Sequence, residues 1–204
     1  LNFFKKIDID AKKLDDNDYS VNIDVDEQPT GDFQVGVTFG TIEGATLITE
    51  LNEKNIAGTG RDLSFVVNTS ENKSKYKLST KEPFAFNQPI NLLYGVEFSE
   101  KDLSSSSSYQ VETLRFDSGI NFDISDKIKY GFFVNYELKD YTITDSSTAA
   151  SSIINSSGKN IFINFINNLN YYNLDSFFNP TEGTSLFYQN TTSPSTNSNG
   201  SLIK

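Results

Sequence analysis

Three carboxylates that lie close together, Asp24, Asp26 and Glu27, form the most suggestive chemical pattern in the chain. Carboxylates that share one face could bind a divalent cation, because hard cations prefer oxygen ligands. The spacing of an EF-hand loop is absent, however, and acidic residues that alternate along an exposed strand usually form a solvated face. A solvated face is therefore the prediction, and no metal site is expected.

The segment Asn55-Ile56-Ala57-Gly58-Thr59-Gly60 superficially resembles a loop that binds phosphate. It lacks the Lys-Ser/Thr pair of a P-loop, and no helical pattern follows it. The two glycines, Gly58 and Gly60, instead indicate a tight turn.

The composition excludes several classes of function, because the 204 residues contain no Cys and no His. Disulfides, thiolate nucleophiles, zinc sites built from Cys or His and every catalytic triad that uses His are therefore excluded. The net charge of −10 argues against a nucleic-acid groove, which needs basic residues to neutralise phosphates. We expect neither an enzyme nor a cofactor, and no nucleic acid as a partner.

Residues that could carry chemistry are therefore few, and the elements that would position them are strands. Apolar and polar residues alternate from Asp32 onward, which predicts strands with one apolar face. The apolar stripes are Phe33–Phe39, Leu47–Leu51, Leu63–Val67, Tyr76–Thr80, Leu92–Phe98, Leu114–Phe122, Ile128–Leu138 and Ile161–Leu169, and Leu186–Tyr188 opens a ninth. Each predicted strand has about 8–11 residues, the length that a tilted strand needs to cross a bilayer.

The connections between these strands alternate in character. On one side they are compact and contain Gly or Pro, and two of them carry Phe pairs (Phe84 with Phe86, and Phe177 with Phe178). On the other side most are longer and rich in Ser, Thr and Asn. The compact connections are Asn52–Gly60, Pro83–Pro89, Asp123–Lys127 and Asp175–Gly183; the others are Thr41–Gly44, which is tight, Asn68–Ser74, Ser99–Ser108, Asp140–Gly158 and Thr191–Ser201.

Short turns, an aromatic girdle and long opposite loops are typical of an outer-membrane barrel. No apolar run approaches the roughly 20 residues of a transmembrane helix, and the mean hydropathy is −0.41. A barrel wall still fits, because its average over lipid-facing and lumen-facing side chains looks soluble. The predicted fold is an all-β, antiparallel, up-and-down transmembrane β-barrel that is incomplete, with about 8–9 strands. A secreted adhesin or sandwich and a plain porin or autotransporter barrel are the alternatives at this point.

Charged residues on the predicted polar face could form ion-pair ladders. The candidate cations are Lys77, Lys81, Arg115 and Lys129, and the candidate carboxylates are Glu50, Glu97, Asp117 and Glu137. Such ladders would hydrate and stiffen a barrel interior. An ion-selectivity ring is the alternative, but the spacing does not favour it.

The first segment, residues 1–28, has a different pattern. Two predicted strands, Phe3–Ile9 and Tyr19–Val25, are separated by the polar stretch Lys12–Asp18, and Asp26–Gly31 marks a break. The chain contains no Met, begins at Leu1 and stops while the strand pattern continues. We therefore expect it to be part of a longer protein.

Several of these segments together resemble the BamA family of the outer-membrane POTRA/β-barrel superfamily. Val21–Gly40 is similar to the junction between the last POTRA domain and the first barrel strand, and Phe3–Ile7 to a strand of that domain. Three turns also match family motifs: Glu50–Gly60 resembles "N-x-x-G-x-G", Leu78–Phe84 resembles "P-Y/F", and Asp175–Gly183 resembles "D-x-x-x-x-P-T-x-G". Each motif alone is weak, but their common order and spacing are specific.

The resemblance implies a domain organisation and a set of functional residues. Residues 1–28 would be the end of the last POTRA domain, 29–31 a joint, and 32–204 the first half of a sixteen-stranded barrel. The joint residues would be Glu27, Pro29, Thr30 and Gly31. The turn residues would be Asn55, Gly58, Gly60, Pro83, Phe84, Asp175, Pro180 and Gly183. The first strand, at the barrel seam, would be Phe33, Gln34, Val35, Gly36, Val37, Thr38, Phe39 and Gly40.

The resemblance also implies a function, namely the assembly and insertion of β-barrel proteins into the bacterial outer membrane by strand templating at the seam. Gly36 and Gly40 would weaken the seam strand; the alternative is that they only relieve crowding. The implied partners are the outer-membrane bilayer, unfolded outer-membrane clients and the periplasmic lipoproteins of the assembly complex. The POTRA part would lie in the periplasm. Other possibilities are a related POTRA-barrel translocation factor, a two-partner secretion transporter, or a passive diffusion porin.

Overall fold

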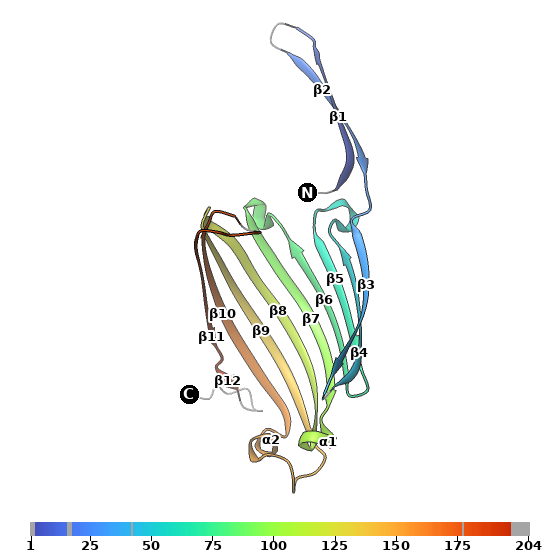
Figure 1. The fold of residues 1–204 in the computed structure, drawn as a ribbon, viewed down its shortest axis with the longest axis vertical. Coiled ribbons are helices and arrows are strands. Elements are labelled where there is room, and N and C mark those ends of the chain that lie inside the picture. The colour runs from blue at the N-terminus through green and yellow to red at the C-terminus, as the bar shows by residue number, and fades with distance from the viewer. Residues whose placement is uncertain (1–2, 16–17, 42, 177, 197–204) are drawn as a thin grey trace.

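Antiparallel strands dominate the computed structural model, which describes residues 3–15, 18–41, 43–176 and 178–196 (Figure 1). The strands are β1 (Phe4–Lys13), β2 (Tyr19–Glu27), β3 (Gly31–Gly40), β4 (Gly44–Glu53), β5 (Asp62–Thr69), β6 (Lys73–Glu82), β7 (Ile90–Asp102), β8 (Tyr109–Ser125), β9 (Ile128–Ile143), β10 (Gly158–Leu174), β11 (Gly183–Thr192) and β12 (Ser195–Thr196). Short helical turns are η1 (Ile56–Gly58), η2 (Ala85–Asn87), α1 (Ser104–Ser107) and α2 (Ser151–Asn155). None of the described helices is long and apolar enough to span a membrane.

The first two strands form a separate two-stranded hairpin that projects from one end of the sheet (Figure 1). Ile7 lies opposite Val25 and Ile9 opposite Ile23, as the alternation predicts. The pairing continues to Lys13, further than the predicted end at Ile9. A ribbon exposed on both faces carries polar residues at little cost, so the backbone ladder extends into the polar stretch.

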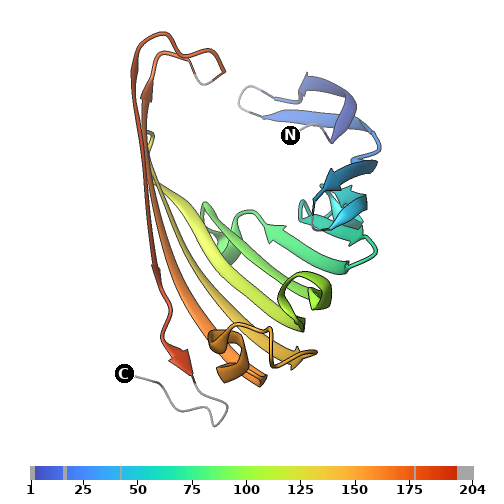
Figure 2. The same ribbon diagram turned by 60° about the horizontal axis from the view of Figure 1, so that its bottom comes forward.

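The strands from β3 to β11 pair in sequence order, each antiparallel to the next, and β12 adds a further short strand beside β10. Figure 2 shows the sheet curved into an open trough, with β3 on one edge and β11 on the other. This arrangement confirms the predicted up-and-down, incomplete barrel. We call the end of the sheet that bears the β1–β2 hairpin the hairpin side, and the end that bears α1 and α2 the far side (Figure 1).

The cross-strand register separates apolar and polar residues onto two faces. Directly paired residues in an antiparallel sheet lie on the same face. One row on the outer face runs Phe33, Leu51, Phe65, Leu78, Val96, Phe116, Tyr136 and Ile163. The neighbouring row on the inner face runs Gln34, Glu50, Val66, Lys77, Glu97, Arg115, Glu137 and Phe162.

Burial is inverted relative to a water-soluble protein. Among the described residues the only buried hydrophobic side chain is Ala85, at 2% exposure. The buried polar side chains are Thr46 and Glu97, each at 6%. Large apolar residues of the outer face, such as Phe65, are exposed. A face of this kind needs an apolar medium rather than a second protein layer.

Four strands are longer than the predicted 8–11 residues, which is a correction to the sequence analysis. Strands β7, β8, β9 and β10 have 13, 17, 16 and 17 residues. They continue beyond the apolar stripe, where Glu100 faces Glu112 and Glu112 faces Asp140. The ladder is made by backbone groups, so it persists where the side chains turn polar. The predicted loops Ser99–Ser108 and Asp140–Gly158 are correspondingly shorter.

An aromatic side chain on the inner face lies over two glycines. A Cβ atom added to Gly119 would lie 2.2 Å from Cδ1 of Phe133, and one added to Gly131 would lie 2.8 Å from its Cε2. Gly119 is directly opposite Phe133. These two glycines therefore make room for the ring, which packs flat on the β8–β9 backbone.

We expect Gly119→Ala to destabilise the sheet by about 1–3 kcal/mol, because an extra methyl group would overlap the Phe133 ring. Unfolding by urea from detergent micelles would measure the change. Gly36→Ala is the matched control, since a Cβ there meets none of the described atoms within 4 Å. An equal loss of stability in the two variants would refute the packing account. The loss in Gly119→Ala combined with Phe133→Ala should be smaller than the sum of the losses in the two single variants.

Candidate functional site

Strand β3 lies at one edge of the sheet. It pairs with β4 along its whole length, from Gly31 opposite Glu53 to Gly40 opposite Gly44. Within the described part of the chain no strand pairs with its other edge. The backbone N–H and C=O groups that point away from β4 therefore have no partner among the described strands. The predicted first strand, residues 33–40, lies wholly within β3.

The inner-face glycines of β3 do not relieve crowding among the described residues. A Cβ added to Gly36 would have no described atom within 4 Å, and one added to Gly40 would reach only the Glu43 nitrogen, at 4.0 Å. By contrast, a Cβ added to Gly95 would lie 2.9 Å from the Leu78 carbonyl oxygen. Crowding thus explains Gly95 but not Gly36. The physical effect of Gly36 is a more flexible, less stable edge strand.

The joint connects the β1–β2 hairpin to the sheet through Gln28, Pro29 and Thr30. Glu27 is the last residue of β2, and Gly31 already belongs to β3. The Gln28 N–H donates to the Phe3 carbonyl oxygen at 3.1 Å. The hydroxyl of Thr30 donates to the Glu53 carboxylate at the end of β4.

The carboxylates of Asp24, Asp26 and Glu27 do not converge on one point. Asp24 lies opposite Asp8 and Asp26 opposite Lys6, whereas Glu27 lies opposite Phe4. Asp24 accepts a hydrogen bond from the Asn22 side chain at 2.9 Å. Asp24 and Asp26 share one face of the exposed ribbon, which agrees with a solvated face.

The turn after β4 shows why its motif has the form N-x-x-G-x-G. The Asn55 side-chain oxygen accepts a hydrogen bond from the Gly60 N–H at 2.6 Å. Gly58 and Gly60 have φ of 73° and 70°, the left-handed region that glycine adopts without a steric penalty. The Asn55 N–H also donates to Glu53 at 2.9 Å. Glu53 therefore ties the joint to this turn.

The turn after β6 presents phenylalanines on a strained backbone. Phe84 and Phe86 have φ of 56° and 59°, which is uncommon for bulky residues. Their side chains are 67% and 74% exposed, while Ala85 between them is buried. The turn follows Pro83 and ends with Pro89. Exposed rings at the end of an apolar wall suit the interface between lipid and water.

The turn after β10 is organised around one carboxylate. Asp175 accepts hydrogen bonds from the N–H groups of Ser176 at 2.9 Å, Thr181 at 3.0 Å and Glu182 at 3.1 Å, and from the Thr181 hydroxyl at 2.5 Å. These donors, the Thr181 hydroxyl first, lower the pKa of Asp175 from 3.8 to about 2. Pro180 precedes Thr181 in this loop.

Gly183 closes the same turn at φ 115°, where a Cβ would lie 2.1 Å from the Asn173 carbonyl oxygen. Phe178 is 98% exposed, and it lies on the hairpin side of the sheet, as the exposed Phe84 and Phe86 do. Phe177, its predicted partner, lies outside the described residues.

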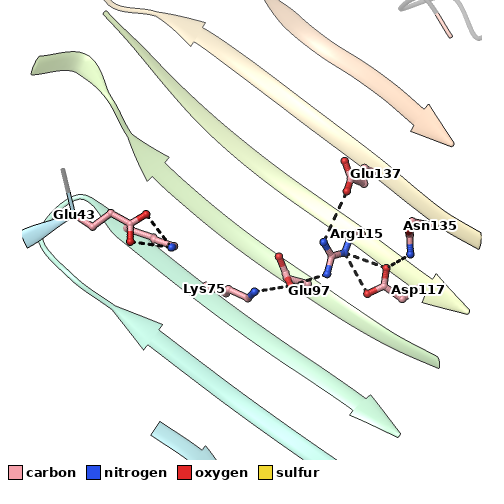
Figure 3. Close-up of polar contacts among 8 residues, drawn as sticks. Glu43, Lys75, Glu97, Arg115, Asp117, Asn135 and Glu137 are labelled. Atoms are coloured by element: carbon pink, nitrogen blue, oxygen red, sulfur yellow. Dashed lines mark hydrogen bonds and ion pairs between the residues drawn. The ribbon is translucent and has the colours of Figure 1, made fainter. Parts of the chain in front are cut away.

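On the far side, a carboxylate in the β3–β4 turn reaches across β5. Glu43 pairs with Lys73 of β6 at 2.9 Å and with Lys101 of β7 at 3.2 Å. Figure 3 shows the Glu43 carboxylate with its two contacts to the lysine of β6, drawn as dashed lines. The hydrogen bond from Lys73 is the main cause that lowers the pKa of Glu43. Glu43 thus holds the far end of the first barrel hairpin, which the sequence analysis did not predict.

The inner face of β6 to β9 carries an ion-pair network centred on Arg115 (Figure 3). The Arg115 guanidinium lies 3.1 Å from Glu97, 3.0 Å from Asp117 and 3.9 Å from Glu137. Lys75 pairs with Glu97 at 3.0 Å, and Lys139 with Glu137 at 2.9 Å. The Asn135 side-chain amide donates to Asp117 at 2.7 Å. This network confirms the predicted pairing of Arg115.

The other predicted ladders need correction. Lys81 pairs with Asp62 at 3.8 Å and Lys129 with Asp123 at 3.7 Å, because these residues are directly opposite in register. Lys75 reaches Glu97 in place of the predicted Lys77, although Lys77 is the residue opposite it. Glu50 accepts a hydrogen bond from the Asn52 side chain at 2.9 Å. The register, which sequence alone did not supply, decides the partners of Lys81 and Lys129.

We expect Glu43→Gln to loosen the far end of the β3–β4 hairpin, because it removes the charge that holds Lys73 and Lys101. The population of molecules in which the β3–β4 turn is detached from β6 and β7 should rise about fivefold. This rise corresponds to a loss of about 1 kcal/mol in the free energy that holds the turn in place. The mobility of a nitroxide on Thr41→Cys, in a chain without other cysteines, would measure it by electron paramagnetic resonance. The stabilisation is present above the ordinary pKa of 4.5 and is lost as pH falls through the lowered pKa.

The pH response should disappear in Glu43→Gln. Asp8→Asn serves as the control, because it removes an exposed ion pair, with Lys6, that lies on the β1–β2 hairpin. Label mobility that does not differ between the wild type and Glu43→Gln would show that the contact does not restrain the hairpin.

We expect Thr181→Val to raise the pKa of Asp175 from about 2 toward 3.8, because it removes the largest stabilising donor. Carbon-13 NMR titration of the aspartate carboxylates would measure the change. The contribution of Asp175 to the free energy of unfolding is present above pH 3.8 and is lost as pH falls toward 2. In Thr181→Val this contribution should be smaller, and it should be lost over a narrower range of pH. Thr184→Val is the control, and a carboxylate pKa that stays near 2 in Thr181→Val would contradict the assignment.

Comparison with known proteins agrees with this geometry. The chain is 22% identical over 191 residues to the outer membrane protein assembly factor BamA of Neorickettsia risticii (strain Illinois), a match covering 93% of this chain and 26% of that protein. The crystal structure of BamA from Haemophilus ducreyi lacking POTRA domains 1–3 matches with a TM-score of 0.76 and 18% identity, over 94% of this chain and 40% of that one. The chain thus spans less than half the length of either relative.

The structural match establishes the fold, and the resemblance inferred from the turn motifs is confirmed. The family model for the Omp85 superfamily domain matches residues 55–204, which is more than half of the sequence. The chain belongs to the Omp85 superfamily.

Proposed function

We propose that this chain is part of a factor that assembles and inserts β-barrel proteins in a bacterial outer membrane. The relative from Neorickettsia risticii is an outer membrane protein assembly factor, and the apolar outer face suits a lipid environment. The observation that carries the proposal is the edge of β3. Its outward backbone groups have no partner among the described strands, and Gly36 weakens the strand although no described atom lies close enough to require a glycine there.

In this proposal the mechanism is strand templating. An incoming barrel precursor pairs one of its strands with β3, so that its backbone N–H and C=O groups are satisfied before it enters lipid. β3 is held at both ends of its hairpin, by Thr30 bound to Glu53 and by Glu43 bound to two lysines. Among the described strands, the middle of β3 pairs only with β4. Such an arrangement keeps the template in place and leaves its outer edge free.

The energy for insertion comes from the client, so no catalytic residue or nucleotide is required. Moving one large apolar side chain from water into lipid is worth about 1.5–3 kcal/mol. Each strand pairing also removes the cost of unsatisfied backbone groups in the membrane.

Residues 1–28 form the end of a POTRA domain in the periplasm, 29–31 a joint, and 32–204 the first half of the barrel. The hairpin side of the sheet then faces the periplasm, where unfolded clients and the lipoproteins of the assembly complex are the partners. The tie from Thr30 to Glu53, and from Glu53 to the Asn55 turn, supports a defined angle at the joint. The exposed Phe84 and Phe86 suit the periplasmic interface of the bilayer.

We expect Gln34→Cys in the full-length protein to form disulfides with cysteines placed in the last strand of a client barrel during its assembly. Gln34 lies on the free-edge strand, and paired residues approach within about 4.5–5.5 Å. Gel electrophoresis of membranes after mild oxidation would detect the adduct. The control is Val66→Cys, which lies at the same level two strands away, where both edges of β5 are paired.

The identity of the adduct separates the alternatives. Adducts with one dedicated secreted cargo in place of barrel clients would indicate a two-partner secretion transporter, and adducts with an exported autotransporter-type substrate alone would indicate a translocation factor. The complete lack of adducts would fit a passive porin. Equal yields of client disulfide adducts at Gln34→Cys and Val66→Cys would refute templating at β3.

A further inference from the structure

A hollow in the apolar outer face lies over strands β5 to β8, toward the hairpin side of the sheet. Its volume is about 570 Å³, its wall includes Leu63, Leu78, Tyr94 and Phe116, and Arg61 lines one end. We call this space the outer hollow. Each of the strands β5 to β8 pairs with a neighbour on both sides, so the outer hollow does not arise from an unpaired edge of the sheet.

The outer hollow forms where a small residue lies between two large ones. Leu63, Thr80 and Tyr94 are directly opposite one another on β5, β6 and β7. The Thr80 hydroxyl donates to the backbone carbonyl oxygen of Asp62 at 2.7 Å. The only polar group of the Thr80 side chain is therefore satisfied within the sheet, and the space beside it remains apolar.

An ion pair lies at the hairpin-side end of the outer hollow. Arg61 directly precedes β5, and Glu82 is the last residue of β6. One guanidinium nitrogen donates to one carboxylate oxygen at 2.9 Å, and among the described residues Glu82 is the only partner of the Arg61 side chain. The two side chains are 45% and 27% exposed. A guanidinium has five N–H donors and a carboxylate has two acceptor oxygens, so each group can bind a second partner.

The distance between the ion pair and the apolar wall matches the thickness of one membrane leaflet. Leu78 and Glu82 lie on the same face of β6, four residues apart, which at about 3.3 Å per residue is about 13 Å. One leaflet contributes about 15 Å to the hydrocarbon core of a bilayer. In the membrane placement proposed above, the outer hollow then faces acyl chains, and the ion pair lies at the level of the headgroups. The exposed Phe84, two residues after Glu82, agrees with this level.

The ligand that fits has to combine an apolar chain with a headgroup that suits both charges. A guanidinium binds phosphate oxygens well, so Arg61 suits a phosphate. Glu82 repels a headgroup that carries only negative charge, and a quaternary ammonium offers its carboxylate no N–H donor. A phosphate that carries a primary ammonium group satisfies Arg61 and Glu82 together.

We propose that the outer hollow binds one phospholipid with a phosphoethanolamine headgroup. Its acyl chain lies against Leu78, Tyr94 and Phe116, which are exposed on the outer face, while its phosphate binds Arg61 and its ammonium group binds Glu82. The proposal rests on the membrane placement proposed above but not on strand templating. A protein that fails to enter bilayers refutes the placement, whereas one that enters and shows no preference for this lipid refutes only the site.

The test uses the full-length protein in phosphatidylcholine vesicles that contain a small amount of phosphatidylethanolamine with a photoreactive acyl chain. A parallel sample contains phosphatidylglycerol with the same chain. After irradiation, mass spectrometry of the peptides locates the lipid adducts. We expect phosphatidylethanolamine to label Leu78, Tyr94 or Phe116 about tenfold more than phosphatidylglycerol does, because its headgroup forms a charge-assisted hydrogen bond with Glu82.

Two variants separate the contribution of the charges from that of the hollow. The double variant Arg61→Glu, Glu82→Arg keeps an ion pair between the two strands but reverses its direction, so the preference for phosphatidylethanolamine should fall about tenfold. Thr80→Leu fills the outer hollow and leaves the ion pair in place, so labelling should fall while the protein stays folded. Thr49→Leu is the matched control, because it makes the same change on the outer face of β4 and should leave labelling unchanged.

Four results would overturn the proposal. They are equal labelling by the two lipids, an unchanged preference in the variant with the reversed ion pair, equal labelling of Thr80→Leu and Thr49→Leu, and adducts spread evenly over the outer face. The last result would show that only the ordinary lipid layer around the wall had been labelled. If the variant with the reversed ion pair does not fold, Thr80→Leu and the comparison of the two lipids still decide the question.

Discussion

The unbroken antiparallel register from β3 to β11 is the constraint on which the rest of this structure depends. Side chains alternate with a period of two, so a slip of one residue between any two strands would exchange the faces of everything beyond it. The row that begins at Phe33 stays apolar as far as Ile163. In these pairings the register shifts only between Asp123 and Ser125, next to the β8–β9 turn and outside the apolar stripe.

Because backbone pairing holds the wall, its side chains are free to serve different purposes in different parts. The inner face of β6 to β9 is cross-linked by the Arg115 network, with Glu97 almost fully buried. Gln34 on β3 and Glu50 on β4 lie at the same level as this network, and Gly36 lies next to Gln34 on the inner face. The β3–β4 hairpin is held near its ends, by Glu43 bound to Lys73 and by Thr30 bound to Glu53. The wall therefore combines a stiff section with an edge strand that yields more easily.

Much of the fold was predictable from the sequence, because the alternation of side chains reports directly which face each residue occupies. The turn motifs were equally informative, since Asn55 with Gly60 and Asp175 with Thr181 act within single loops. Contacts between strands were harder to predict. The ring of Phe133 over Gly119, the reach of Glu43 across β5 and the pairing of Lys129 with Asp123 depend on register and curvature, which periodicity does not encode. Strand ends were misjudged where polar side chains continue a backbone ladder.

The importance of the β3 edge follows from a rule about hydrogen bonds in lipid. A polar group that faces hydrocarbon is stable only when another group satisfies it, whether it belongs to the backbone or to a side chain. The edge of β3 offers backbone donors and acceptors in a row, which suits an extended strand of any sequence. Pairing of this kind reads only the backbone, so the side chains of a paired strand do not have to match those of β3.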